Sequence, residues 1–473
     1  MVVRREREIR EFVKTPFYRV IESVNVDGHT FTGEWRAVKG SAYFESPKLY
    51  KENGFKEKEE AKKLIAVLKE GTSPLTCRIV SIEKKKEKKN PPLLFNLAEL
   101  QNECSKRFKI SPDETLRIVQ ELYEKKLVTY PRTDARVLST AVSKEITKNL
   151  NGLSKYQMTA PYMQDILHYG AYKNLAKTRY VNDKQITDHY AIIPTGQGLS
   201  ALNSVSATAH HVYDVIVRRF LSIFYPPAVY QKVALVTQIG KEQFFSNFRV
   251  LAEEGYLKVA GVPAPKKNAN GNDAEGDGSD NNVDLDAAFF ASIQKLKKGD
   301  ILDVKSLDIK EGETSPPKRY NSGSMILAME NAGQLIEDEE LRAQIKGSGI
   351  GTSATRAEIL KKLFNIKYLA LNKKTQVITP TLLGEMIYDV VLNSIRSLLN
   401  PELTASWEKG LNYVAEGEIT SDEYMTKLDH FIVSRTNGVL GLNNQYQLRS
   451  CYDRAAVFYK KETKGRVLKG KKE

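Results

Sequence analysis

The most restrictive stretch of this sequence runs from residue 97 to residue 134, where two amphipathic helices lead into a short extended run. The second helix has clear start signals: Ser111 is a good N-cap, Pro112 suits the first helical position, and Glu114 follows three residues after the cap. Apolar residues then recur at helical spacing as far as Leu122 and Tyr123. A helix, a turn, a second helix and a short strand are therefore predicted in this order.

The extended run Leu127–Asp134 closes this winged-helix-like unit and carries chemically useful side chains. Tyr130 follows apolar residues typical of a strand, and Pro131 restricts the backbone beside it. A tyrosine that attacks phosphorus forms a phosphotyrosine and divides one difficult step into two easier ones. Because an ordinary phenol has a pKa of about 10, it needs a nearby cation or proton acceptor at neutral pH. Arg132 can supply that cation, although Tyr-x-Arg alone is also compatible with a tyrosine that only packs.

Length, charge and cysteine content limit the class of protein. The 473 residues suggest about three domains, and the net charge of +14 favours a polyanionic partner. The 3 cysteines have no C-x-x-C spacing, so neither a disulfide framework nor a zinc ribbon is predicted. No apolar run approaches the ~20 residues that cross a bilayer, and the N-terminal sequence lacks a signal-peptide pattern. These features predict a cytoplasmic protein without a membrane partner.

Several blocks in a fixed order resemble a type IA DNA topoisomerase, an isomerase, of the topoisomerase III kind. They are Pro91–Gln101, Leu122–Glu124, Tyr130–Asp134, Asp188–Thr195, Pro316–Tyr320, Gly349–Arg356 and Pro401–Glu408. The resemblance covers roughly residues 8 to 435. It implies a multidomain α+β fold with a winged-helix-like tyrosine domain, an antiparallel β arch and an α-helical domain, in a protein associated with the nucleoid.

The resemblance also implies domain boundaries. The end of the helical domain is expected at 1–12, and the first half of the arch at 13–92. The tyrosine domain follows at 93–222, and the second half of the arch at 223–315, with a flexible insertion at 262–287. The helical DNA-binding domain is expected at 316–437 and a basic tail at 438–473.

The family motifs assign roles to four residues around the tyrosine. The resemblance implies that Tyr130 is the nucleophile and that Arg132 stabilises the charge on the transferred phosphoryl group. His189 is expected to support Tyr130, and Asp134 to orient Arg132 or a neighbour. The implied reaction is transient cleavage of one strand through a 5′-phosphotyrosine, strand passage and resealing. Such a reaction relaxes negative supercoils or decatenates DNA without ATP.

A second group of residues is expected to contact single-stranded DNA. Thr352, Thr355 and Arg356 lie where a glycine turn opens a helix, and free backbone N–H groups at a helix start suit a phosphate. Arg319 belongs to another matching block and receives the same expectation. Single-stranded and negatively supercoiled DNA are the expected substrates.

The sequence departs from the family pattern because no Toprim domain is recognised. Mg²⁺ is implied by the family, but its Toprim ligands are not in this chain, so no metal-binding residues are predicted. One interpretation is a topoisomerase whose Toprim-containing piece is lost or separate. Another is an inactive remnant or split subunit that binds single-stranded DNA. A tyrosine recombinase or relaxase is a further alternative, since those enzymes also combine tyrosine with arginine or histidine.

Overall fold

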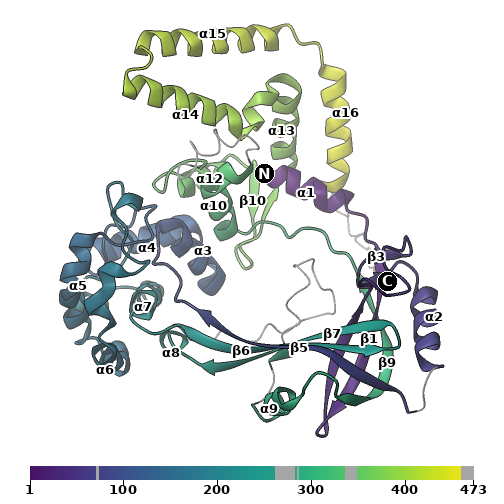
Figure 1. The fold of residues 1–473 in the computed structure, drawn as a ribbon. Helices are drawn as coiled ribbons and strands as arrows, with labels where there is room; N and C mark the ends of the chain where they lie inside the picture. The colour runs from purple at the N-terminus through teal and green to yellow at the C-terminus, as the bar shows by residue number, and fades with distance from the viewer. Residues whose placement is uncertain (71–73, 262–282, 285–286, 336–348, 460–473) are drawn as a thin grey trace, which may run out of the picture.

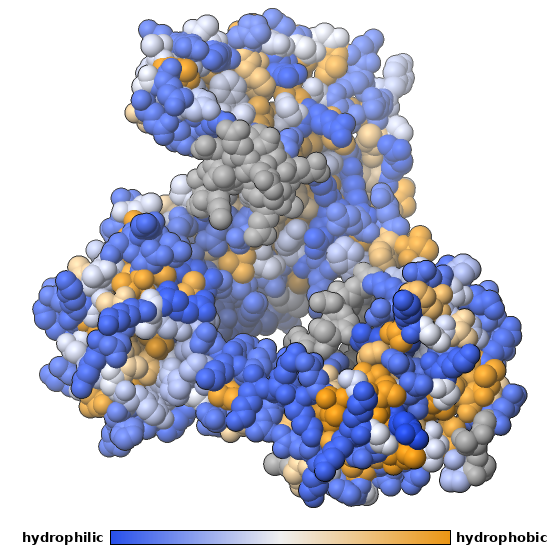
Figure 2. Space-filling model, viewed as in Figure 1, coloured by the Kyte–Doolittle hydropathy of each residue, from blue (hydrophilic) through white to orange (hydrophobic). Residues whose placement is uncertain are grey.

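The computed structural model describes residues 1–70, 74–261, 283–284, 287–335 and 349–459. Three regions, each with its own hydrophobic core, are arranged in a ring (Figure 1). Figure 2 shows a hollow between them, and the surface that borders it is mostly hydrophilic. We name the three regions the tyrosine region (residues 93–227 and 255–261), the β arch (12–70, 74–92, 228–254, 283–284 and 287–315) and the helical region (1–11, 316–335 and 349–459). The predicted α+β class is confirmed.

The tyrosine region is helical and has the most extensive core of the three. Its elements are α3 (Leu97–Phe108), α4 (Pro112–Glu124), α5 (Thr140–Leu153), η1 (Gln157–Thr159), α6 (Ala160–Tyr169), η2 (Ala171–Lys177), η3 (Asp183–Gln185), η4 (Leu199–Ser204), α7 (Ala207–Ser222) and α8 (Leu257–Ala260). Helix α4 begins as the sequence predicts, with the Ser111 hydroxyl accepting from the Glu114 N–H at 3.2 Å. Leu122 is buried, but Tyr123 is 39% exposed, because it lies in the last turn of the helix.

The β arch is a single sheet that closes on itself. Its strands are β1 (Pro16–Val26), β2 (His29–Arg36), β3 (Leu49–Lys51), β4 (Gly54–Phe55), β5 (Thr76–Lys89), β6 (Ala228–Ile239), β7 (Glu242–Glu253), β8 (Val283–Asp284) and β9 (Ile301–Glu313). The order is β2-β7-β6-β5-β9-β1-β4-β3, and β2 also pairs with β1. All pairings are antiparallel except β7 with β8. Helices α2 (Lys58–Lys69) and α9 (Ala287–Lys295) flank the sheet (Figure 1).

Strands β5, β6 and β7 extend beyond the body of the arch as a ribbon that reaches the tyrosine region (Figure 1). The register of β5 with β6 continues from Arg78↔Gln238 to Lys89↔Ala228. The chain therefore enters the tyrosine region at the end of β5 and leaves it at the start of β6.

The helical region contains both ends of the described chain. Its elements are α1 (Val2–Glu11), α10 (Ser322–Glu330), η5 (Ala332–Leu335), α12 (Arg356–Asn365), β10 (Leu369–Leu371), β11 (Ile378–Pro380), α13 (Leu382–Ser394), η6 (Arg396–Leu399), α14 (Pro401–Glu416), α15 (Ser421–Leu440), α16 (Gln445–Ala456) and η7 (Val457–Tyr459). Ion pairs from Arg7 to Glu385 (3.2 Å) and Asp389 (2.9 Å) hold α1 against α13.

Two sequence predictions concern the insertion and the tail. Most of the predicted insertion, 262–287, lies outside the described residues. The predicted tail begins at 438, and between 438 and 459 the chain completes α15 and forms α16 and η7. The Tyr459 hydroxyl donates to Glu385 at 2.5 Å, which ties this segment to α13. Residues 460–473 lie outside the described residues. Among the described helices, none is both long and apolar enough to cross a membrane.

Candidate active site

Tyr130 lies in an extended segment between α4 and α5, which backbone pairing fixes to residues 191–195. The Thr129 N–H donates to the Ile193 carbonyl at 3.0 Å, and the Thr195 N–H donates to the Leu127 carbonyl at 3.0 Å. The Thr129 hydroxyl adds a bond to the Ala191 carbonyl at 3.0 Å. The predicted short strand is thus only an isolated bridge, Val128↔Pro194. This pairing brings two family blocks, far apart in the sequence, side by side.

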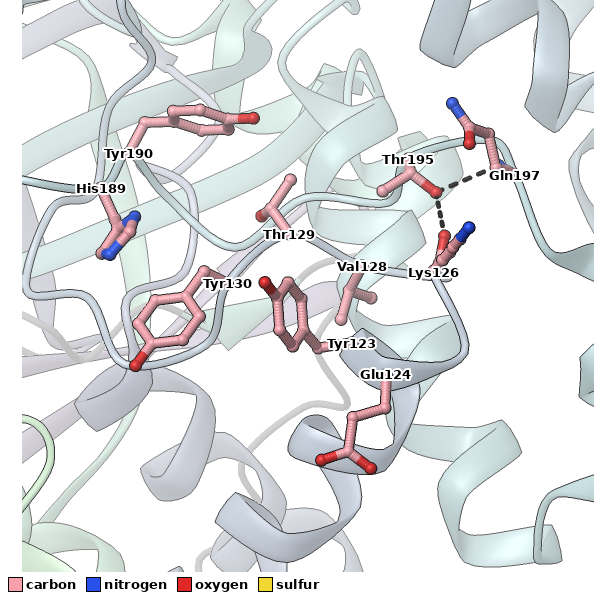
Figure 3. A pocket seen from close by; sticks show the side chains of 10 residues that line it. All are labelled: Tyr123, Glu124, Lys126, Val128, Thr129, Tyr130, His189, Tyr190, Thr195 and Gln197. Carbon is pink, nitrogen blue, oxygen red and sulfur yellow. Dashed lines mark hydrogen bonds between the residues drawn. The ribbon is translucent and has the colours of Figure 1, made fainter.

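The Tyr130 ring contacts two other aromatic rings (Figure 3). Its centroid lies 4.3 Å from that of His189, with the planes tilted by 42°, and 5.4 Å from that of Tyr123, at 82°. Tyr130 is half-buried and His189 is exposed. The Tyr130 hydroxyl makes no hydrogen bond to a described residue, so it is available to a substrate.

Arg132 and Thr133 follow Tyr130 and have opposite environments. Arg132 is exposed and forms no ion pair with any described residue, which leaves its guanidinium available for a phosphate. Thr133 is 4% exposed, and its hydroxyl donates to the His189 carbonyl at 2.8 Å. Its own carbonyl accepts from the Leu97 N–H, at the start of α3, at 3.1 Å. Sequence reasoning did not single out Thr133, although its place inside the motif was a usable signal.

Asp134 was expected to orient Arg132 or a neighbour, and among the described residues the partner of its carboxylate is Arg356. Its carboxylate accepts from the Arg356 guanidinium at 2.9 Å, which joins the tyrosine region to α12 of the helical region. The Asn96 amide donates both to the Asp134 carbonyl (3.2 Å) and to the Glu330 carboxylate (2.7 Å). Burial raises the pKa of Glu330, although Arg356, 3.9 Å away, opposes the shift. This interdomain network consists of Asn96, Asp134, Glu330 and Arg356.

The expectation that Arg356 contacts DNA directly does not fit its position. Only 1% of the side chain is exposed, because the guanidinium is enclosed by Asp134 and the Ile350 carbonyl. Thr352 and Thr355 remain exposed at the start of α12, where the Thr355 hydroxyl accepts from the Thr352 N–H at 2.9 Å. Arg319 is held by both oxygens of Glu6, at 2.7 and 2.9 Å, so much of its charge is neutralised.

The described residues offer no fitting site for the Mg²⁺ that the resemblance implies. No three His, Cys, Asp or Glu side chains in the described ranges lie close enough together to hold a metal ion. Asp134 and Glu330 both face the Arg356 guanidinium, which already neutralises them. No chemical step is therefore assigned to a metal held by these residues.

Comparisons with known proteins show which family the chain resembles. A family model described as DNA topoisomerase matches residues 1–426. DNA topoisomerase 3 of Bacillus licheniformis is 31% identical over 451 residues, covering 94% of this chain and 56% of that protein. DNA topoisomerase 3 of Bacillus subtilis is 32% identical over 425 residues, covering 89% and 52%. The chain thus spans about half the length of these curated relatives.

A solved structure shows the same fold. Full-length topoisomerase I from Thermotoga maritima superposes with a TM-score of 0.61 at 22% sequence identity, covering 92% of this chain and 61% of that one. The family model covers most of the chain, and the ordered blocks around Tyr130 lie within its match. This chain therefore belongs to the type IA DNA topoisomerase family.

Proposed function

We propose that this chain carries the tyrosine part of a type IA topoisomerase site, and that Tyr130 cuts one strand of DNA. The observation that carries the proposal is the contact of the Tyr130 and His189 rings at 4.3 Å. Arg132 follows Tyr130 by two residues, and its exposed guanidinium forms no ion pair with a described residue. A nucleophile, a hydrogen-bond donor and a cation that can bind phosphate are thereby combined within the tyrosine region.

In the proposed step, the Tyr130 oxygen attacks the phosphorus of a phosphodiester. The bond from the tyrosine oxygen to phosphorus forms, and the bond from phosphorus to the 3′ oxygen breaks. The phenol proton passes to an acceptor, and the departing 3′ oxygen takes up a proton. Resealing is the reverse attack by the 3′ hydroxyl, and no ATP is needed because the phosphotyrosine ester conserves the bond. Arg132 stabilises the charge of the transition state, and His189 donates to a phosphate oxygen.

Other residues position this chemistry. Thr133 fixes the backbone of His189, and the Asp134–Arg356 pair fixes the end of the tyrosine segment against α12. We propose that Thr352 and Thr355, with the backbone at the start of α12, contact phosphates of single-stranded DNA. Arg356 then acts through Asp134 as a positioning residue.

The proposed substrates are single-stranded and negatively supercoiled DNA, and the outcome is relaxation or decatenation. The family resemblance implies Mg²⁺ bound by a Toprim domain, and such an ion would supply positive charge near the phosphate. We propose that a Toprim-containing portion completes the site. A chain that only binds single-stranded DNA is the second candidate, favoured by the lack of a metal-ligand cluster among the described residues.

The polarity of the covalent product tests the proposal. The chain is joined to the unmatched portion of the Bacillus subtilis relative, supplied with Mg²⁺, and mixed with single-stranded oligonucleotides labelled at the 3′ or the 5′ end. Denaturation should leave the 3′ label on the protein, and Tyr130→Phe should abolish it. Retention of the 5′ label would indicate the 3′-phosphotyrosine of a recombinase. Binding without any adduct would favour the second candidate.

A further inference from the structure

A pocket of about 510 Å³ lies directly beside Tyr130 (Figure 3). Its walls are the last turn of α4, the segment 128–130 and the loop 189–197. The volume lies within the range of about 300–1,000 Å³ that small-ligand sites occupy. The cleavage chemistry uses Tyr130 and His189 from its walls but leaves the rest without a role.

The pocket is built into the backbone. Helix α4 ends at Glu124, and Lys126, with a φ of 60°, turns the chain out of the helix. The turn is closed by the Lys126 N–H, which donates to the Tyr123 carbonyl at 2.8 Å. Gly198, with a φ of 66°, lets the opposite loop approach, since any side chain there would collide with the Lys125 carbonyl. The Thr195 hydroxyl then donates to the Lys126 carbonyl at 2.5 Å and accepts from the Gln197 N–H at 3.0 Å. The walls are therefore held in place without a ligand.

We propose that this pocket binds an unpaired nucleobase of the strand that Tyr130 cuts. Tyr123 offers an aromatic surface that is 39% exposed, and bases stack on such surfaces in single-strand binding proteins. The Gln197 amide is exposed and makes no hydrogen bond to a described residue, so both its donor and its acceptor can meet the edge of a base. Burial raises the pKa of Tyr190, which keeps a further hydroxyl protonated as a donor.

The charge around the pocket also fits one nucleotide. Lys126 is exposed and forms no ion pair with a described residue, so its ammonium can meet the phosphate that flanks the base. Glu124 already accepts from the Gln120 amide at 3.1 Å. A pocket with aromatic, amide and hydroxyl groups and a cation at its rim suits a base with its phosphate better than a purely apolar ligand.

The pocket belongs on the tyrosine-linked side of the cut. All of its walls come from the tyrosine region, so a base bound there moves with Tyr130 and not with the arch or the helical region. This step rests on the proposed function, in which the 5′ phosphate stays on the tyrosine. The pocket would hold the first bases of the linked strand in register until the 3′ hydroxyl returns.

Comparison of normal and base-free DNA tests the inference. Fluorescence anisotropy measures binding of the full chain to an oligothymidylate and to an abasic oligonucleotide of equal length. Tyr123→Ala should weaken oligothymidylate binding about 5- to 150-fold, as expected for one stacked base, and leave abasic binding unchanged. Tyr123→Phe should bind normally. Tyr169→Ala, at a tyrosine that is 51% exposed elsewhere in the region, is the matched control.

Two results would overturn the inference. In the first, Tyr123→Ala binds oligothymidylate as tightly as the unaltered chain. In the second, Tyr123→Ala loses affinity for both oligonucleotides by the same factor. Photocrosslinking with 5-iodouracil oligonucleotides gives a second readout that does not depend on the variant folding. Mass spectrometry should find the label on the peptide that contains Tyr123, and labelling only outside the pocket walls would contradict the inference. A 3′-label adduct on Tyr130 with either negative result would refute this inference alone. Failure of the unaltered chain to bind oligothymidylate would overturn the proposed function as well.

Discussion

The Asp134–Arg356 pair predicts a specific loss of stability where the tyrosine segment meets the helical region. Asp134→Asn keeps the shape of the side chain and removes its charge. The Arg356 guanidinium, 1% exposed, then loses the carboxylate 2.9 Å away. It retains the Ile350 carbonyl at 3.3 Å and Glu330 at 3.9 Å.

The magnitude follows from the burial of the two partners. Breaking a fully buried ion pair costs about 3–5 kcal/mol, whereas an exposed pair contributes about 0.2–1 kcal/mol. Asp134 is 42% exposed, and Arg356 keeps other partners, so the loss must be discounted for solvent screening. We expect about 1–2 kcal/mol, which corresponds to a roughly 5- to 30-fold change in an equilibrium constant.

Amide hydrogen exchange measures this loss locally. Exchange in α12 and at the start of α3 should become roughly 5- to 30-fold faster in Asp134→Asn, while the arch strands stay unchanged. Glu423→Gln is the control, because Glu423 forms an exposed pair with Lys427 at 2.8 Å within α15. Unchanged exchange in α12, or equal acceleration throughout the arch, would refute the proposed interdomain role of Asp134.

Three further predictions concern other parts of the chain. Arg132→Gln should weaken binding of single-stranded DNA and lower the slope of log K against log salt by about 0.7, as for one lost phosphate contact, measured by anisotropy at several salt concentrations; an unchanged slope would contradict that contact. Thr133→Val should destabilise the chain by about 1 kcal/mol in urea unfolding, with Thr133→Ser close to wild type, because a buried hydroxyl bond to His189 is lost. Burial raises the pKa of Glu22 to about 7 in the arch. A raised carboxyl pKa adds stability that is present below the unfolded value and lost as the pH rises through about 7. The free energy of unfolding should therefore fall by roughly 2–3 kcal/mol between pH 5 and pH 8. Glu22→Gln should abolish this contribution to the pH dependence, and the exposed control Glu83→Gln should leave it unchanged.

Local features of the fold could be predicted from the sequence. The start of α4 follows from Ser111 and Pro112, because capping depends only on neighbouring residues. The order of the family blocks predicted the fold class. Helical spacing predicts that Tyr123 belongs to the apolar stripe of α4. Spacing does not show whether another element covers the last turn of the helix, and Tyr123 is 39% exposed there.

Long-range partners could not be predicted. Arg356 lies 222 residues after Asp134 in the sequence, so only tertiary packing brings the two side chains together. A charged residue at the start of a helix looks like a surface contact until its burial is known. The predicted basic tail includes residues 438 to 459. Composition alone does not show where such a segment packs, and here the Tyr459 hydroxyl bonds to Glu385 of α13.

The most direct test of the account is to identify the residue that carries the DNA. The chain, joined to the unmatched portion of a relative and supplied with Mg²⁺, is trapped on single-stranded DNA, digested with nuclease and protease, and analysed by mass spectrometry. The account predicts a 5′-linked nucleotide on Tyr130 and no adduct in Tyr130→Phe. A nucleotide on any other residue, or a 3′ linkage on Tyr130, would contradict it.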